Sequence, residues 1–135
     1  LSSRSFVVGL LFAIFLVNFL STVFGWYFVQ GAWIDKPLHF VGGFWIVCVL
    51  LYLCRVYPKT LPFPTSFLSR ILFLLGVVAL VGVCWEFFEF CFDIVFGLGD
   101  SVIRTQLDLA DTMGDLFLDL MGAGIATFFY LRSRD

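Results

Sequence analysis

Long apolar runs, separated by short polar or proline-rich stretches, make up most of the chain. The runs predict four membrane-spanning helices, at about residues 6–28, 36–57, 67–97 and 107–131. Each run exceeds the roughly 20 residues that a helix needs to cross the hydrocarbon core of a bilayer. A membrane β-barrel would show short segments of alternating hydrophobicity instead. The pattern therefore predicts an all-α, polytopic membrane protein with four transmembrane helices in a compact bundle.

The segments between the runs carry signals that end helices. Three prolines interrupt residues 58–66, and Thr65 or Ser66 can cap the helix that follows. Gly97 and Gly99 are typical of the end of the third helix. No repeat or long linker divides the 135 residues, so the sequence predicts a single domain over residues 1–135.

Basic residues flank the predicted spans unevenly. Six lie on one side and two on the other: Arg4, Arg55, Lys59, Arg70, Arg132 and Arg134, against Lys36 and Arg104. Short loops rich in Lys and Arg stay in the cytoplasm, so we expect both termini to be cytoplasmic. The sequence thus predicts a multi-pass protein of the inner (plasma) membrane, in contact with membrane lipid.

Composition supports this class and excludes others. The chain is 61% hydrophobic and 13% charged, whereas a soluble domain is about a quarter charged. A basic patch is absent from the sequence, so nucleic acid is not an expected partner. The four cysteines lie in apolar runs without a CxxC pair, which favours small buried side chains over a thiolate metal site or a disulfide framework.

The acidic residues gather on the side opposite the basic loops. Helical phase, at about 100° per residue, places Glu86 and Asp93 nearly in line on the third helix, with Glu89 about 60° away. The fourth helix carries its aspartates within about 80° of one another; they are Asp108, Asp111, Asp115 and Asp119. Asp35 and His39 form an i, i+4 pair at the start of the second helix. We expect these side chains to converge in one intramembrane pocket.

Ionised carboxylates inside a bilayer are costly, so such a cluster needs a physical explanation. A bound divalent cation is one, and oxygen-rich ligands suit Mg²⁺, Mn²⁺ or Ca²⁺, while a histidine also permits Zn²⁺ or Fe²⁺. The candidate metal ligands are His39, Glu86, Glu89, Asp93, Asp111, Asp115 and Asp119. A water-filled cavity with protonated carboxyls, or a purely structural hydrogen-bond network, would also explain the cluster.

Other residues are candidates for the wall of the same pocket. They are Asn18, the one strongly polar residue within the first span, and Asp35, Arg104 and Asp108. Asn18 could instead bond a neighbouring helix, and Asp35 could be a solvated loop residue. The small residues at 42–43, 114 and 122–124 are typical of close contact between membrane helices.

The sequence from Asp35 to Phe44, DKPLHFVGGF, resembles the DKxxHF opening of VanZ-like bacterial membrane proteins. A later glutamate, an arginine and a D-x3-N-x2-G-A helix follow in that family. Glu86 or Glu89, Arg104, and the segment from Asp115 to Ala123 are similar to them, with Asp119 in place of the usual Asn. The resemblance implies a link to glycopeptide (teicoplanin) resistance and to the cell envelope.

A second resemblance is to the inner-membrane family that includes YjdF, with its HFxxGF motif, its glutamate-bearing helix and its DTQWDM segment before a Gly-Ala pair. The matching stretches are His39–Phe44, Trp85–Glu86 and Asp111–Leu116. It covers about the last three spans and supports a functional site without naming a reaction.

Three classes of function remain open. The leading hypothesis is a protein that binds divalent cations and acts on cell-envelope or lipid-headgroup chemistry, with a lipid-linked or envelope substrate. The alternatives are a proton- or cation-coupled transporter working as a homo-oligomer, and a non-catalytic membrane assembly subunit. The sequence does not decide whether the protein is an enzyme.

Overall fold

The computed structural model describes residues 3–26, 33–96 and 108–133. In these residues the chain forms four α-helices and no strands, and the helices are α1 (Arg4–Val23), α2 (Asp35–Val56), α3 (Phe67–Phe96) and α4 (Leu109–Arg132). All four are long and apolar enough to cross a membrane. The predicted all-α class with four membrane-spanning helices is therefore confirmed.

The helix bounds lie near the predicted ones, with one correction. We expected the first helix to reach residue 28, but α1 ends at Val23. Two residues later Gly25 adopts a left-handed backbone with φ of 69°, a conformation that ends a helix and that glycine adopts without steric cost. The predicted limits at 97 and 107 lie outside the described residues.

The third helix is longer than a bilayer is thick. Its 30 residues span about 45 Å, against a hydrocarbon core of about 30 Å. It begins where expected, directly after the proline-rich connection, and the Ser66 hydroxyl accepts a hydrogen bond from the Ser69 amide at 3.1 Å. Such a helix tilts or extends beyond the membrane, which allows residues in its last third to lie within the hydrocarbon region.

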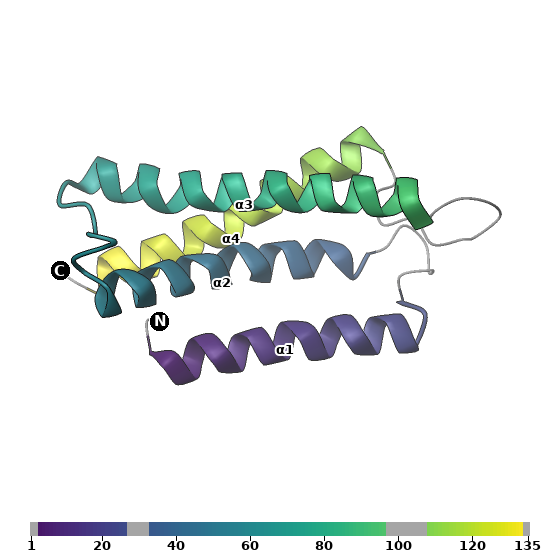
Figure 1. The fold of residues 1–135 in the computed structure, drawn as a ribbon, viewed down its shortest axis with the longest axis horizontal. Coiled ribbons are helices and arrows are strands. Elements are labelled where there is room, and N and C mark those ends of the chain that lie inside the picture. Colours follow the sequence, from purple (N-terminus) through teal and green to yellow (C-terminus); the bar gives the residue numbers. More distant parts are fainter. Residues whose placement is uncertain (1–2, 27–32, 97–107, 134–135) are drawn as a thin grey trace.

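The helices run alternately up and down, so the bundle has two chemically different ends (Figure 1). We call the end where α2 and α4 begin the acidic end, and the end where they finish the basic end. Arg4 and Arg132 both lie at the basic end, together with the α2–α3 connection (Figure 1). This places the described parts of both chain ends on one side, while their orientation relative to the cytoplasm stays a prediction.

Helices α2 and α4 form the most extensive contact of the bundle, and α3 packs mainly on α4. Two glycines permit the close approach of α2 and α4. A Cβ atom at Gly43 would overlap the backbone carbonyl of Asp119, and one at Gly122 would overlap the carbonyl of Phe40. Small residues at such a crossing let helix backbones approach closely in lipid.

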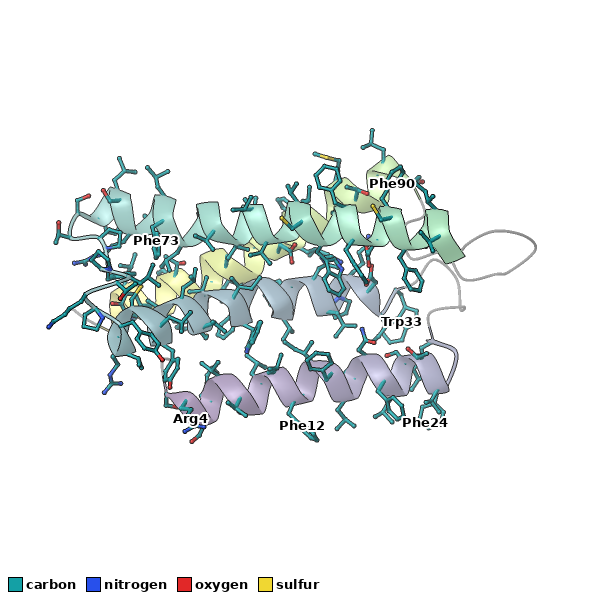
Figure 2. The ribbon with its side chains drawn as sticks, in the orientation of Figure 1. Arg4, Phe12, Phe24, Trp33, Phe73 and Phe90 are labelled. Carbon is teal, nitrogen blue, oxygen red and sulfur yellow. The ribbon has the colours of Figure 1, made fainter. Side chains whose placement is uncertain are left out.

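Helix α1 is attached less firmly and packs mainly on α2. The indole Nε1 of Trp45 in α2 donates a hydrogen bond to the carbonyl of Val7 at 2.9 Å. Most of the other α1 side chains are exposed, and Phe12 and Phe24 project away from the neighbouring helices (Figure 2). An apolar exposed surface of this extent is expected for side chains that face lipid.

The basic half of the bundle has a continuous apolar core, which we call the apolar layer. It is made of buried side chains from α2, α3 and α4: Val47, Leu50, Leu51, Leu74, Val78, Ala123 and Ala126. The acidic half is filled differently, by the polar side chains described next.

A candidate metal centre at the acidic end

Among the described residues, five carboxylic acids and one histidine are buried together at the acidic end, each less than a tenth exposed. They are Asp35 and His39 of α2, Glu86 and Glu89 of α3, and Asp115 and Asp119 of α4. Along α4, Asp115 and Asp119 lie about 9 and 15 Å from Leu109, inside the span. The predicted convergence of three helices on one polar region therefore has a direct counterpart in the structure.

Lys36 belongs to the site, although the sequence analysis counted it among the flanking charges and not among the site residues. Its Nζ lies 2.8 and 2.9 Å from the two carboxylate oxygens of Asp115 and 2.5 Å from Oδ1 of Asp111. It also donates to the backbone carbonyl of Asp111 at 3.3 Å. Lys36 thus ties the start of α2 to the first turns of α4. The sequence signal for this role was its position beside Asp35, at the depth of the aspartates.

His39 lies at the centre of the cluster and is only 5% exposed. Its Nδ1 lies 3.4 Å from Oδ1 of Asp119, and its Nε2 lies 3.8 Å from Oδ2 of Asp35. Within the described residues, neither Nε2 of His39 nor Oδ2 of Asp35 has a hydrogen-bond partner. A buried polar atom without a partner is costly, so these two atoms mark a place where a ligand would be stabilised.

Two overlapping groups of three residues have the geometry of a metal site, and both include His39. Asp35, His39 and Asp115 form one group, and His39, Glu86 and Glu89 form the other. In each group, one ligand atom from each of the three residues lies within 4.8 Å of the other two, and all these residues are buried. Five of the buried side chains can therefore contribute to one or two adjacent ions.

The charges around His39 do not balance among the described residues. Six acids contact Lys36 or His39 or belong to the two groups, and Lys36 and His39 are the basic residues that face them among the described residues. The acids are Asp35, Glu86, Glu89, Asp111, Asp115 and Asp119. Lys36 compensates the pair formed by Asp111 and Asp115. The acids nearer to His39 then require cations or protons to reach neutrality in a low-dielectric setting.

The remaining candidates fall at the margin of the cluster. Asp93 is half-buried and belongs to neither group of three. Asp108 caps α4, since its Oδ1 accepts a hydrogen bond from the Asp111 amide at 2.9 Å. Asn18 lines a cavity together with His39. Arg104 lies outside the described residues.

Two openings reach the cluster from its flanks. A cavity of about 250 Å³ lies among α1, α2 and α3, and Asp35, His39 and Asp119 form part of its wall. A wider groove of about 490 Å³ runs between α3 and α4, with Glu86, Asp108 and Thr112 among apolar side chains. The polar cluster is therefore accessible from between the helices.

Toward the basic end, the cluster is followed by the apolar layer. Val47, Leu74, Val78, Ala123 and Ala126 of that layer are 0% exposed, so α2, α3 and α4 pack there without a polar passage among their described residues. Among the described residues, the site is therefore bordered by buried apolar side chains toward the basic end.

Comparison with known proteins shows the family of this chain. Residues 3–135 match the model of a family described as "Predicted membrane protein (DUF2238)", and the protein belongs to this family. An uncharacterized protein of Thermotoga maritima is 37% identical over 108 residues, which cover 78% of this chain and 47% of that relative. The chain thus spans about half the length of the curated relative that it matches. No solved structure matches it.

Proposed function

We propose that this membrane protein binds a divalent cation at the acidic end of the bundle, with Nε2 of His39 as the central ligand. The observation that carries the proposal is the environment of the imidazole. Asp119 lies beside Nδ1, while Nε2 has no hydrogen-bond partner among the described residues, and His39 belongs to both groups of buried carboxylates. Metal-binding histidines commonly donate one ring N–H to a carboxylate, which leaves the other nitrogen for the metal.

This arrangement assigns different roles to the acids. Glu86 and Glu89, or Asp35 and Asp115, would supply oxygen ligands, because an oxygen of each lies within 4.8 Å of a ring nitrogen of His39. Asp119 would orient His39 and increase its basicity. Asp111 would hold Lys36, and Asp93 would take no direct part. Four of the five proposed ligands are therefore among the seven candidates from the sequence, and Asp35 is the fifth.

The ligand chemistry favours Mn²⁺ or Zn²⁺ over Mg²⁺ or Ca²⁺. Imidazole nitrogen suits transition metals, whereas Mg²⁺ and Ca²⁺ prefer oxygen ligands throughout. Mg²⁺ also dehydrates reluctantly, and a buried site shared by five protein side chains leaves little room for its water shell. A mixed set of one nitrogen and several carboxylates is typical of Zn²⁺ or Mn²⁺.

We further propose that the bound ion serves cell-envelope or lipid-headgroup chemistry in the plasma membrane. Lateral openings between helices, with the polar cluster at their inner end, suit substrates that reside in the bilayer. A divalent ion there would polarise a phosphoryl or carbonyl oxygen or activate water. The resemblance of the DKPLHF segment to VanZ-like proteins and of the HFVGGF segment to the YjdF family points to the same cellular setting.

Ion or proton transport is a weaker candidate. A transport path would have to continue from the cluster to the basic end, and the apolar layer fills that region in α2, α3 and α4. A homo-oligomer could form a path between subunits, but the carboxylates around His39 face the interior of a single chain. Binding and chemistry at a pocket fit this arrangement better.

Thermal unfolding of the detergent-solubilised protein tests the metal site. We expect Mn²⁺ or Zn²⁺ to raise the melting temperature relative to a chelator, because a ligand that binds only the folded state adds about 2.7 kcal/mol at a hundredfold excess over its dissociation constant. The gain should shrink in Glu86→Gln, Glu89→Gln and Asp115→Asn, which keep side-chain shape and remove charge.

Asp93→Asn is the matched control, because it removes a carboxylate from the same helix without altering either group of three. Its metal-dependent gain should equal that of the unaltered protein. Absence of any metal effect at neutral pH, together with higher stability of the Gln and Asn variants in chelator, would show that the cluster is held by protons instead.

The orientation of the bundle has its own test. We expect both termini in the cytoplasm, because the basic end carries Arg4, Arg55, Lys59, Arg70 and Arg132. In a variant without the native cysteines, a cysteine at residue 101 should react with an impermeant reagent in intact cells, and one at Ser133 should be protected. The reverse labelling pattern would invert the orientation.

A further inference from the structure

The cavity among α1, α2 and α3 has a polar part and an apolar part. Its polar wall is formed by Asn18, Asp35, His39 and Asp119. Its apolar wall includes Leu11 and Ile14 of α1, Ile46 of α2 and Val81 of α3. The two parts differ in their distance from the acidic end, and this difference indicates what kind of molecule fits.

The polar part lies nearer to the acidic end and the apolar part nearer to the middle of the bundle. Asp35 and His39 occupy the first two turns of α2, whereas Ile46 is about 17 Å further along the helix from Asp35. On α1, which runs toward the acidic end, Asn18 likewise lies about 10 Å beyond Leu11. Both walls therefore change from apolar to polar in the same direction.

This gradient has the orientation of a lipid in the leaflet around the acidic end, with its headgroup toward that end and its chain toward the bilayer centre. The cavity is bordered by exposed apolar side chains, Phe15, Val81 and Trp85, which are 65%, 41% and 47% exposed. In a bilayer these side chains face lipid. A lipid can therefore enter sideways without leaving the hydrocarbon region.

The polar wall also indicates the headgroup. Oδ2 of Asp35, a residue only 8% exposed, is a hydrogen-bond acceptor without a partner among the described residues. Asp119 adds a second carboxylate to the same wall. Such a wall favours a group that donates hydrogen bonds and tolerates negative charge around it.

We infer that the α1–α2–α3 cavity is a binding site for a membrane lipid whose headgroup donates hydrogen bonds, through a hydroxyl or an ammonium group. The headgroup lies against Asp35 and His39, and one chain lies along Leu11, Ile14 and Ile46. One part of this inference rests on the proposed function, namely that the lipid is the substrate of the metal centre, since His39 belongs to both sites. Docking of the lipid needs no metal.

Native mass spectrometry of the detergent-solubilised full chain, with lipids added one at a time, tests the site. Phosphatidylethanolamine and phosphatidylglycerol have headgroup donors, and phosphatidylcholine has none. We expect the first two to be retained about fivefold better than phosphatidylcholine, the ratio that corresponds to one net hydrogen bond of about 1 kcal/mol. Equal retention of all three lipids would overturn the inference.

Gly42→Leu provides a variant that blocks the cavity. Gly42 lines it, and a Cβ atom at this position would meet nothing within 4 Å. The added side chain should fill the space beside His39 and abolish selective lipid retention. Gly76→Leu is the matched control, because a Cβ there also meets nothing within 4 Å and the residue is not part of the cavity wall. Unchanged lipid selectivity in Gly42→Leu would refute the site.

Ile14→Trp narrows the same cavity from the α1 side and should give the same loss if Gly42→Leu is poorly folded. The metal-dependent gain in melting temperature, measured on the same samples, separates the two proposals. Lipid selectivity without any metal effect would leave the lipid site intact and refute the metal centre. A metal effect with no lipid selectivity would support the metal centre and refute the lipid site.

Discussion

The two halves of this bundle have interiors of opposite chemistry, one mainly apolar and the other rich in acidic side chains. In the basic half, the interior is mainly apolar, and Val47, Leu74 and Ala126 have exposures of 0%. In the acidic half, the corresponding interior positions carry carboxylates and one histidine. The same three helices, α2, α3 and α4, contribute to both halves, so the difference lies in the side chains and not in the architecture.

The comparison shows which half the fold requires. Apolar packing alone associates helices in lipid, and the basic half demonstrates it within this chain. Buried ionised groups cost several kcal/mol each, and replacing them by apolar residues of similar volume is often neutral or stabilising. We therefore expect that the acidic half does not add to the stability of the bundle, which is the pattern of regions where buried polar groups serve a function.

Removing Lys36 should produce the largest effect, because it breaks the two shortest ion pairs found among the described residues. In Lys36→Met, Asp111 and Asp115 lose their cation, and an uncompensated buried charge costs about 3 kcal/mol or more. The free energy of unfolding, measured in mixed detergent micelles with chelator present, should fall by about this amount. Since the Lys36 side chain is 33% exposed, we expect a value at the lower end of the range.

The double variant Lys36→Met, Asp115→Asn checks the cause. It should recover most of the lost stability, because the most buried carboxylate of the pair is then neutral. If Lys36→Met is neutral by itself, the two aspartates are protonated in the folded protein, and the charge imbalance of the acidic half is smaller than described above.

An apolar truncation in the basic half should cost somewhat less and leave the site intact. Leu74→Ala removes a fully buried side chain from the apolar layer, and the cavity that it leaves should cost about 2 kcal/mol. Its metal-dependent gain in melting temperature should match that of the unaltered protein. A reduced gain would mean that the two halves are coupled and that the division drawn here is wrong.

The sequence predicted the helices well, because a helix that is surrounded by lipid needs a long run of apolar residues, and such runs are visible in the sequence. It also predicted that acids on three helices converge, since helical phase and span order fix both direction and depth. It did not predict the partners of Lys36 or the position of Asp93 outside the groups around His39. Lys36 pairs with residues more than 70 positions away, and a single sequence does not distinguish such a partner from a topogenic loop charge.

Asp93 shows the limit of phase arguments. It shares a helix face with Glu86, but it lies about 10 Å further along α3. The residues of α3 that belong to the groups around His39 are Glu86 and Glu89, without Asp93. Phase gives the direction of a side chain, whereas the depth of the site depends on how far α2 and α4 overlap. That overlap is set by the contacts of Gly43 and Gly122, which the sequence identified only as small residues typical of helix contacts.

Asp119→Asn should have the smallest effect on stability and is the sharpest test of the difference between the two halves. The amide keeps the shape of the carboxylate and can still accept a hydrogen bond from Nδ1 of His39, so in chelator we expect the free energy of unfolding to change by about 0.5 kcal/mol or less. Metal affinity should nevertheless fall about 10- to 100-fold, because the carboxylate beside a metal-binding imidazole raises its basicity and fixes its orientation.

Titration of Mn²⁺ or Zn²⁺ measures this loss, and Asp93→Asn again serves as the control with unchanged affinity. Affinity unchanged in Asp119→Asn would mean that Asp119 does not support His39, and the metal centre would then have to be built from the carboxylates alone.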